Sequence, residues 1–312
     1  MREHSSAEQF NGTKSTVVTI GTFDGVHMGH RKIIDRLVAS AQSNDYESVV
    51  LTFFPHPRMV VQKDTGIKLI NTIKERTRLL EKTGLDHLIV HPFTKEFSRL
   101  TAESFVKDIL VDQLKAKKVI IGYDHHFGRN RNADITDLRR FGKQFGFDVE
   151  EISKQDIDDV AISSTKIRRA LEEGNIIKAN EFLGYPFMLT GIVSRGKGLG
   201  RKLNYPTANL HLKEDYKLIP AKGVYVVQAE IDGQNFHGMM NIGTNPTVGG
   251  SELTIETYFF DLDKDLYDRT LQIDLLTRIR KEMKFNTVEE LIEAMKADEV
   301  FSKKYIETLN DK

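Results

Sequence analysis

Short apolar runs alternate with longer amphipathic stretches along the first half of the chain. The apolar runs are rich in Val, Ile and Phe, as buried strands are, and they lie at residues 17–20, 48–54, 87–90 and 118–121. A fifth strand is expected at residues 147–152. Apolar residues recur at helical spacing between them, at residues 33–41, 71–82, 101–114 and 135–145. Strands that alternate with helices of this length predict βαβ units, and therefore an α/β domain with a mostly parallel sheet.

Local signals add detail to this first half. Thr101 is a predicted helix N-cap, and Pro55 and Pro57 should stop any regular element between the second strand and the next helix. The segment from Met1 to Lys14 is polar, and we expect it to fray or to end in a short strand.

The pattern changes at Tyr185-Pro186, which we take as the boundary between a first domain of residues 1–185 and a second of residues 186–312. Glycines at 174 and 184 end two helices just before it. Candidate strands then follow at short intervals, at residues 187–194, 223–231, 236–242, 254–260 and 270–276. Such spacing, with a hairpin turn at Asp232-Gly233, predicts a small antiparallel β-barrel or a sandwich.

A single helix is expected at the C-terminal end of the second domain. Thr287 and Glu290 have the spacing of a capping box, which marks its start. The residues expected to face inward are Leu291, Ile292, Met295 and Phe301.

Composition narrows the class of protein. The 312 residues carry 45 Lys and Arg against 45 Asp and Glu, so no overall basic field favours nucleic acid or an anionic membrane surface. The absence of cysteine excludes disulfides, thiolate zinc sites and a Cys nucleophile. No apolar run reaches the roughly 18–20 residues of a membrane-spanning helix, and no signal peptide is evident. We therefore expect a cytoplasmic protein.

The glycine-rich stretch of residues 21–30 joins the first strand to the first helix. Gly21 and Gly25 allow backbone amides to approach a ligand closely, and the following helix N-terminus favours an anion. His27 and His30 are three residues apart and share one helix face. The pattern predicts a phosphate site, although a zinc site or a structural histidine pair would have the same spacing.

A second candidate anion site begins near Ser163, at the start of a later helix. Ser163 or Ser164 could cap that helix. Lys166 and Arg168 oppose the helix dipole, an arrangement that an anion at the terminus would stabilise. The alternative interpretation is a solvated basic helix start.

Two stretches of the second half also carry candidate chemistry. Glycines alternate with cations in residues 196–202, as in a flap over phosphates. Thr207 and Asn209 point to one side of an extended segment and offer hard oxygen ligands for Mg²⁺ shared with substrate phosphates. Glu256 leaves the apolar face formed by Leu253, Ile255 and Phe259, so it could act as a base or be a solvent-facing strand carboxylate.

These motifs support a family assignment. The stretch ending in His27-Met-Gly-His30 resembles the HxGH signature of the nucleotidyltransferases, and Ser163-Ser-Thr-Lys-Ile-Arg168 resembles its downstream partner. Pro206-Thr-Ala-Asn209 resembles the motif of riboflavin kinases. In this order they resemble the bacterial bifunctional riboflavin kinase/FMN adenylyltransferase family, also called FAD synthetase.

The resemblance implies a Rossmann-like nucleotidyltransferase domain followed by a six-stranded antiparallel barrel kinase domain with a C-terminal helix. It implies that the second domain transfers the γ-phosphoryl group of ATP to riboflavin and makes FMN. The first domain would transfer AMP from another ATP to FMN, giving FAD and pyrophosphate. The implied partners are riboflavin, FMN and ATP with Mg²⁺, no nucleic acid and no membrane, in a monomer or weak homo-oligomer.

The resemblance also implies roles for individual residues. His27, His30 and Glu256 would be catalytic, and Thr207 and Asn209 would hold the metal. The expected flavin or nucleotide contacts are Phe54, Pro55, Asp124 and Phe127, for which a turn-forming Asp and core aromatics are the alternatives. The expected ATP and phosphate contacts are Gly21, Phe23, Asp24, Gly25, Ser163, Ser164, Thr165, Lys166, Arg168, Gly196, Lys197, Gly198 and Arg201.

The sequence departs from the family pattern at two positions. Ala161 and Ile162 stand where a basic residue often precedes the Ser-Ser-Thr motif, and Asn204 replaces a glycine before the kinase motif. Three other functions remain open: a single active half with the other as scaffold, a non-catalytic flavin or nucleotide sensor, and an unrelated cytidylyltransferase.

Overall fold

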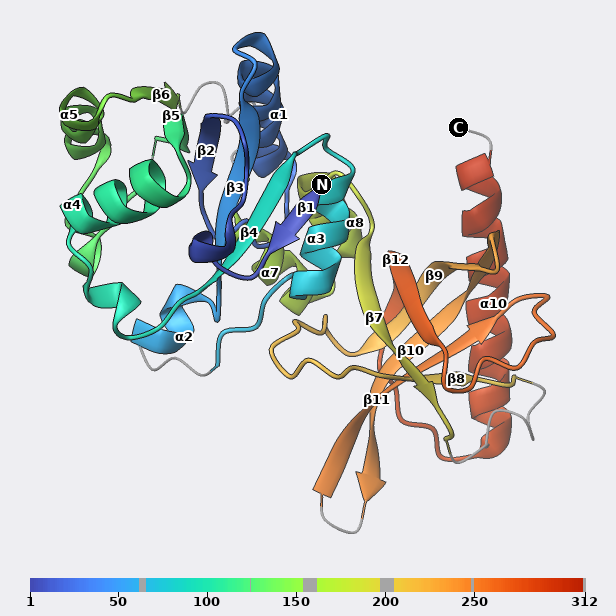
Figure 1. The fold of residues 1–312 in the computed structure, drawn as a ribbon. Coiled ribbons are helices and arrows are strands. Elements are labelled where there is room, and N and C mark those ends of the chain that lie inside the picture. The colour runs from blue at the N-terminus through green and yellow to red at the C-terminus, as the bar shows by residue number, and fades with distance from the viewer. Residues whose placement is uncertain (62–65, 124, 154–161, 197–204, 248–249, 311–312) are drawn as a thin grey trace. The chain divides into compact units, whose positions relative to one another are not determined.

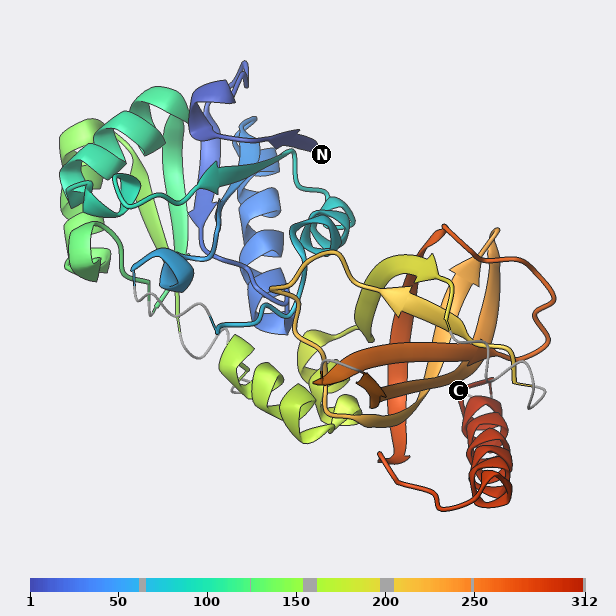
Figure 2. The same ribbon diagram turned by 90° about the horizontal axis from the view of Figure 1, so that it is seen from below.

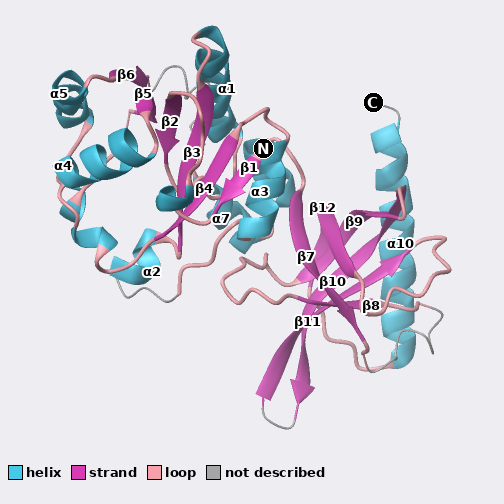
Figure 3. Cartoon of the chain, in the orientation of Figure 1, coloured by secondary structure: helices cyan, strands magenta, loops and turns pink. Residues whose placement is uncertain are grey.

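A computed structural model describes residues 1–61, 66–123, 125–153, 162–196, 205–247 and 250–310, without the side chains of residues 245–247, 250–252 and 310. Its contacts divide the chain into two compact units, Met1–Ser164 and Thr165–Lys312. The first mixes helices with parallel strands, whereas the second combines antiparallel strands with helices before and after them (Figure 3). The functional boundary expected at residue 185 stays a prediction.

The first unit contains a parallel sheet with the strand order β1-β4-β3-β2-β5-β6 (Figure 1). All five predicted strands are present. The apolar runs of the central strands β2 and β3 are nearly continuous because both faces of the sheet are covered there, whereas β6 at the edge carries two glutamates. The strands are β1 (Arg2–His4), β2 (Thr16–Ile20), β3 (Glu47–Phe54), β4 (His87–Pro92), β5 (Ala116–Gly122) and β6 (Asp148–Ile152).

Helices lie on both faces of this sheet (Figure 2). One face packs on a π-helix (Phe105–Gln113) through Val18, Ile20 and Leu51, and α1 (Met28–Ser43) lies on the other face. The predicted helix over 101–114 is thus α-helical only in α4 (Ala102–Ser104), although Thr101 is its N-cap as expected. The other helices are α2 (Pro57–Val61), α3 (Ile73–Glu81) and α5 (Ile135–Phe145), with 3-10 turns at Ala7–Gln9, Phe97–Arg99 and Arg129–Arg131.

The N-terminal segment is ordered rather than frayed. β1 pairs in parallel with β4, so the short strand is confirmed. His4 Nε2 lies 3.0 Å from His87 Nδ1, and the Ala7 amide donates to His91 Nδ1 at 3.1 Å. Polar residues of the segment are held because two buried histidines of β4 offer hydrogen-bonding partners.

The expectation that Pro55 and Pro57 exclude regular structure is wrong. Pro57 begins the short helix α2. Proline is compatible with a first helical position because the amide hydrogen it lacks would have no partner there.

The second unit is built around a closed antiparallel barrel with the strand order β10-β11-β8-β7-β12-β9. The barrel prediction and the Asp232-Gly233 turn are confirmed, with φ of 54° and 77° at these two residues. β8 is an additional strand that no apolar run marked. The barrel strands are β7 (Phe187–Ser194), β8 (Ala208–His211), β9 (Gly223–Ile231), β10 (Gln234–Thr247), β11 (Gly250–Phe259) and β12 (Thr270–Lys281), preceded by α7 (Ser164–Glu173) and α8 (Ile176–Leu183).

The C-terminal helix α10 (Val288–Asn310) packs on the barrel through Met295 and Ile306. The inward position expected for Phe301 is wrong, since its side chain is 44% exposed. Asp298 and Ser302 are buried instead. The Asp298 carboxylate binds the Arg280 guanidinium through contacts of 2.8 and 2.9 Å, and this pairing on β12 sets the rotation of the helix.

Candidate active sites

The turn after β2 reverses the chain through unusual backbone conformations. Phe23, Gly25 and Val26 have φ of 46°, 95° and 34°, in the left-handed region. Such strain at non-glycine residues persists only where the surroundings enforce it. Here the side chains of Phe23 and Val26 are buried, with 2% and 0% exposure, and anchor the turn in the core.

His27 and His30 lie stacked at the N-terminus of α1. Their ring centroids are 3.6 Å apart and the rings are inclined by 17°. His27 is the N-cap, and its Nδ1 accepts the His30 amide hydrogen at 3.3 Å. Because Nδ1 is then an acceptor, the ring proton of neutral His27 is on Nε2, where it can be donated to a ligand.

Burial keeps both histidines neutral. It lowers the pKa of His27 to about 4, although the charge of Asp24 acts in the opposite direction. Burial also lowers the pKa of His30 well below its ordinary value, and the charges of His27 and Arg76 add to this effect. The pair therefore offers N–H donors rather than fixed positive charge. Within the described residues, no cluster of three His, Cys, Asp or Glu side chains could hold a metal ion.

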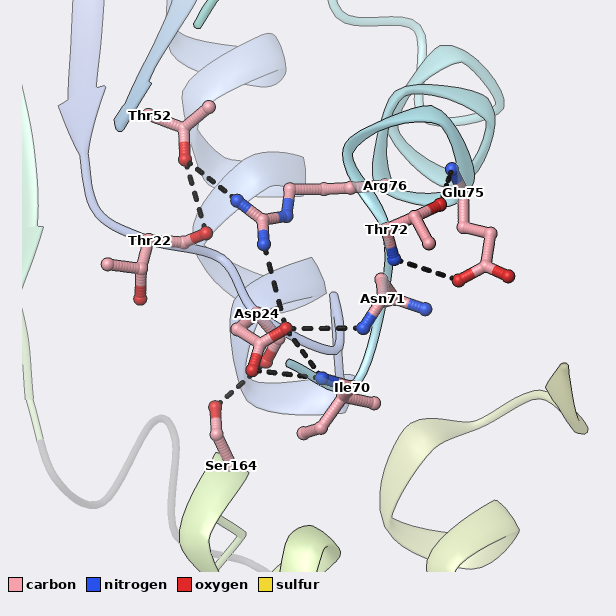
Figure 4. Close-up of polar contacts among 9 residues, drawn as sticks. All are labelled: Thr22, Asp24, Thr52, Ile70, Asn71, Thr72, Glu75, Arg76 and Ser164. Carbon is pink, nitrogen blue, oxygen red and sulfur yellow. Dashed lines mark hydrogen bonds and ion pairs between the residues drawn. The ribbon is translucent and has the colours of Figure 1, made fainter. Parts of the chain in front are cut away.

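Asp24 is held inside the protein by the segment that leads into α3 (Figure 4). Its carboxylate accepts the Ile70 amide at 3.0 Å and the Asn71 amide at 3.2 Å, and lies 3.6 Å from Nη2 of Arg76. Asp24 was expected to contact phosphate, and its carboxylate, which is 1% exposed, here binds these protein groups. Sequence reasoning missed Arg76.

Ser164 links the two motif segments of the first unit. Its hydroxyl donates to the backbone carbonyl of Asp24 at 2.8 Å (Figure 4). The expected pairing of the glycine-rich turn with the Ser-Ser-Thr motif is present at this residue. Thr165, Lys166 and Arg168 belong to the first turns of α7 in the second unit, where Thr165 and Lys166 are exposed.

The expected flavin contacts have different surroundings. Phe54 ends β3 and Pro55 follows it, at the edge where the glycine-rich turn leaves β2, since the amide of Gly21 donates to the carbonyl of Leu51. Parallel sheets bind ligands at this edge. Phe127 is 7% exposed and packs in the core, as in the alternative interpretation. Asp124 lies outside the described residues, as does Ala161.

The kinase motif gathers three oxygen-bearing side chains, two on the neighbouring strands β8 and β11 and one just before β8. Asn209 of β8 lies opposite Glu256 of β11, and the Thr207 hydroxyl donates to Glu256 Oε2 at 3.2 Å. Glu256 is half-buried between the buried residues Ile255 and Thr257, so it leaves the apolar face as predicted. Leu253 is 40% exposed rather than inward, because residues 250–254 pair with β10 alone in a hairpin that extends past the other strands.

Gly196 lies against the side chain of Asn209. A Cβ atom at this position would be 2.2 Å from Asn209 Nδ2, so no larger residue fits without moving the amide. The flap residues that follow, including Lys197, Gly198, Arg201 and Asn204, lie outside the described residues.

Tyr205 connects the kinase motif to the C-terminal helix. Its hydroxyl donates to Glu299 Oε2 at 2.9 Å, and its ring packs edge-on against Tyr258. Burial raises the pKa of Tyr205 to about 12, and the bond to Glu299 adds to the shift. Tyr205 comes two residues before Thr207, so α10 helps to fix the backbone that carries this hydroxyl.

Two family models match the chain, one over each half. The model described as FAD synthetase matches residues 10–166, and the model described as riboflavin kinase matches residues 183–306. In the described residues, no helix combines the length and apolar character that crossing a membrane requires.

Known proteins resemble the chain over nearly its full length. The bifunctional riboflavin kinase/FMN adenylyltransferase of Escherichia coli K12 is 35% identical over 290 residues, covering 93% of this chain and 92% of that protein. The protein of the same description from Listeria monocytogenes is 36% identical, covering 95% of this chain and 94% of its own. A crystal structure described as a macrolide-efflux protein from Streptococcus pneumoniae matches with a TM-score of 0.87 at 32% identity, covering 97% of this chain and 98% of that one.

Proposed function

The chain belongs to the bifunctional riboflavin kinase/FMN adenylyltransferase family, and from this premise we propose the residues that perform each of its two reactions. The second unit phosphorylates riboflavin with ATP, and the first transfers AMP from ATP to the resulting FMN. The stacked pair of His27 and His30 at the start of α1 is the observation that carries the assignment of the adenylyl-transfer site.

Adenylyl transfer requires positioning and charge stabilisation rather than a covalent enzyme intermediate. An oxygen of the FMN phosphate attacks the α-phosphorus of ATP, the bond to the β-phosphate oxygen breaks, and pyrophosphate leaves. Neutral His27 and His30 donate N–H bonds to the triphosphate. Backbone amides of the turn after Gly21 and the N-terminus of α1 would add further donors.

The Ser-Ser-Thr motif would bind the leaving pyrophosphate. Ser163 and Thr165 would donate hydroxyl hydrogen bonds, and Lys166 and Arg168 would neutralise the charge that develops as the bond breaks. Ser164 has its hydroxyl on the Asp24 carbonyl, so we assign it to the support of the turn. Phe54 and Pro55 would contact the flavin, whereas Phe127 packs in the core.

Riboflavin phosphorylation would take place at Glu256. This carboxylate would accept the proton of the riboflavin hydroxyl as its oxygen attacks the γ-phosphorus of ATP and ADP leaves. The Thr207 hydrogen bond to Oε2 fixes the orientation of the carboxylate. Gly196, Lys197, Gly198 and Arg201 would close over the phosphates and exclude water.

The same side chains fit Mg²⁺ bound together with ATP. Thr207 and Asn209 supply a hydroxyl and an amide oxygen beside Glu256, and hard oxygen ligands of this kind suit a cation that shares its coordination with phosphates. When bound, the ion would neutralise phosphate charge during transfer. We further propose a cytoplasmic location, which the lack of cysteine supports, and a monomer or weak homo-oligomer.

A product-resolved assay tests these assignments. The full chain is incubated with riboflavin, ATP and MgCl₂, and FMN and FAD are separated by chromatography. His27→Ala/His30→Ala should make FMN but no FAD, whereas Glu256→Gln should lose FMN formation and still convert added FMN to FAD. Each variant is the folding control for the other, and loss of both activities in either folded variant would contradict the division of labour.

A further inference from the structure

A buried arginine lies beside the glycine-rich turn of the adenylyltransferase site. Arg76 of α3 is 1% exposed, yet its guanidinium contacts polar groups on two sides. Nη1 donates to the Thr52 hydroxyl at 3.3 Å, and Nη2 lies 3.6 Å from the Asp24 carboxylate (Figure 4). The arginine therefore joins α3, β3 and the turn after β2.

The contacts of Arg76 reach the turn both before and after Phe23. The Thr52 hydroxyl, which accepts from Arg76, donates in turn to the Thr22 carbonyl at 3.1 Å. Arg76 is thus connected to the turn on either side of Phe23, through Thr22 and through Asp24. Phe23 is the first residue with a positive φ, and His27 follows four positions later.

Net stability is a poor explanation for this pair. Asp24 and Arg76 have side-chain exposures of only 1% and 2%, and the desolvation of two buried charges offsets most of their attraction. A hydrophobic pair of similar volume would serve a core equally well. The planar guanidinium, in contrast, contacts two acceptors at a fixed angle, which a hydrophobic side chain cannot do.

The charge of Arg76 also acts on the catalytic histidines. Among the described residues, two charged groups act on the pair: Arg76 disfavours protonation of His30, as His27 also does, whereas Asp24 favours protonation of His27. Arg76 therefore helps to keep His30 in the neutral form.

We propose that Arg76 is a positioning residue for adenylyl transfer, holding the turn at Thr22 and Asp24 so that its amides and the histidine pair keep their geometry toward the triphosphate. The inference rests on the proposed role of His27 and His30. It predicts an effect on kcat for FAD formation rather than on riboflavin phosphorylation.

Arg76→Lys is the principal test, because lysine keeps the positive charge but lacks the planar guanidinium that contacts two acceptors. We expect kcat for FAD formation from FMN and ATP to fall roughly 10- to 100-fold, as for a small misplacement of reacting groups. The KM for ATP should change less than kcat, and FMN formation should stay at the wild-type rate. An unchanged kcat in Arg76→Lys would overturn the proposal.

Two further variants separate positioning from folding. Arg76→Met should move the acid limb of the pH–rate profile for FAD formation to higher pH, whereas Arg76→Lys should leave the limb in place. Asp24→Asn/Arg76→Met removes both charges, so no buried ion is left unpaired. A folded double variant, checked by circular dichroism, with wild-type kcat would show that the pair is only structural.

The same assay distinguishes failure of this proposal from failure of the proposed function. If His27→Ala/His30→Ala still makes FAD, the function of the histidines is wrong. If that variant is inactive while Arg76→Lys is normal, only the role of Arg76 is wrong.

Discussion

The hydroxyl of Ser164 donates a hydrogen bond of 2.8 Å to the backbone carbonyl of Asp24, which lies 140 residues earlier in the chain. The carboxylate of the same aspartate binds the amides of Ile70 and Asn71. Two segments that are distant in sequence, at Ser164 and at residues 70–71, therefore meet at one residue of the turn. The Ser164 hydroxyl holds the backbone of the turn, and the backbone amides of residues 70–71 hold the side chain of Asp24.

Removing the Ser164 hydroxyl should impair FAD formation. Loss of one hydrogen bond of this kind is worth about 1 kcal/mol, which corresponds to roughly a fivefold lower kcat/KM for FAD formation from FMN if the bond holds the active geometry. Ser164→Ala should leave riboflavin phosphorylation unchanged. The measurement is steady-state kinetics of both reactions on the same preparation.

Ser98→Ala provides a matched control for this prediction. The Ser98 hydroxyl also donates to a backbone carbonyl, that of Lys95 at 2.7 Å, but it does so within its own local turn. A general loss of stability would affect both variants alike. Equal kcat/KM values in Ser164→Ala and wild type would remove Ser164 from the support of the site.

Much of the fold followed from local pattern. The central strands β2 and β3 of the first sheet were predicted correctly because a strand covered on both faces is mostly apolar, and that pattern needs no partner to be recognised. β1 could not be found in this way. It consists of Arg2, Glu3 and His4 at the sheet edge, and its stabilising partners on β4 are distant in sequence.

The misassigned and missed residues have related causes. Phe301 fits the helical spacing of the apolar face, but the ion pair between Asp298 and Arg280 turns a different face toward the barrel. Arg76 did leave a signal, because it shares helical spacing with Ile73 and Leu80 and so places a charge on a buried face. Its partner Asp24 could not be predicted from spacing, since tertiary structure alone brings them together.

The buried histidines should make the first unit sensitive to acid. The pKa of His27 falls from 6.5 to about 4 on folding, chiefly through burial, and burial lowers the pKa of His30, His87 and His91 as well. Between pH 6.5 and about 4, the unfolded chain binds more protons at His27 than the folded chain does. The contribution of His27 to the free energy of unfolding is therefore fully present above pH 6.5 and is lost as the pH falls toward 4. In this pH range, His27 alone should make the free energy of unfolding change by up to about 1.4 kcal/mol per pH unit.

Urea unfolding between neutral pH and about pH 5 measures this slope. His27→Gln should flatten the dependence, because glutamine does not titrate. His91→Gln should flatten it too, since the Ala7 amide donates to His91 Nδ1 only while that nitrogen is unprotonated. Slopes identical to wild type in both variants would exclude these histidines as the source of acid sensitivity.

A methyl group at position 196 should disable the kinase. The Cβ of Gly196→Ala would lie 2.2 Å from Asn209 Nδ2 and 2.6 Å from its Cγ, so the amide must leave its position beside Glu256. If Asn209 helps to hold ATP with Mg²⁺, we expect riboflavin phosphorylation to fall by about tenfold or more, as for other displaced positioning groups. Conversion of added FMN to FAD should be unaffected.

Gly233→Ala is the control for the glycine substitution. Gly233 lies in a barrel hairpin with a φ of 77° and nothing within 4 Å of an added Cβ. Alanine there should lower stability by about 1–2 kcal/mol and leave the kcat of the kinase intact. A normal kcat in Gly196→Ala would show that Asn209 can move without consequence for phosphoryl transfer.

Loss of the Tyr205 hydroxyl should loosen the C-terminal helix and weaken the kinase. The hydroxyl donates to the Glu299 carboxylate at 2.9 Å, and because the pair is only partly shielded from solvent we expect Tyr205→Phe to cost about 1 kcal/mol. The raised pKa of Tyr205, about 12, means that this contribution is present at neutral pH and is lost only as the pH rises from about 10 through 12.

Amide hydrogen exchange in α10 should accelerate around Glu299, and kcat for riboflavin phosphorylation should fall because Thr207 is two residues from Tyr205. Tyr305→Phe is the matched control, since that hydroxyl on the same helix forms no hydrogen bond to another described residue; equal exchange in both variants would refute the coupling between α10 and the kinase motif.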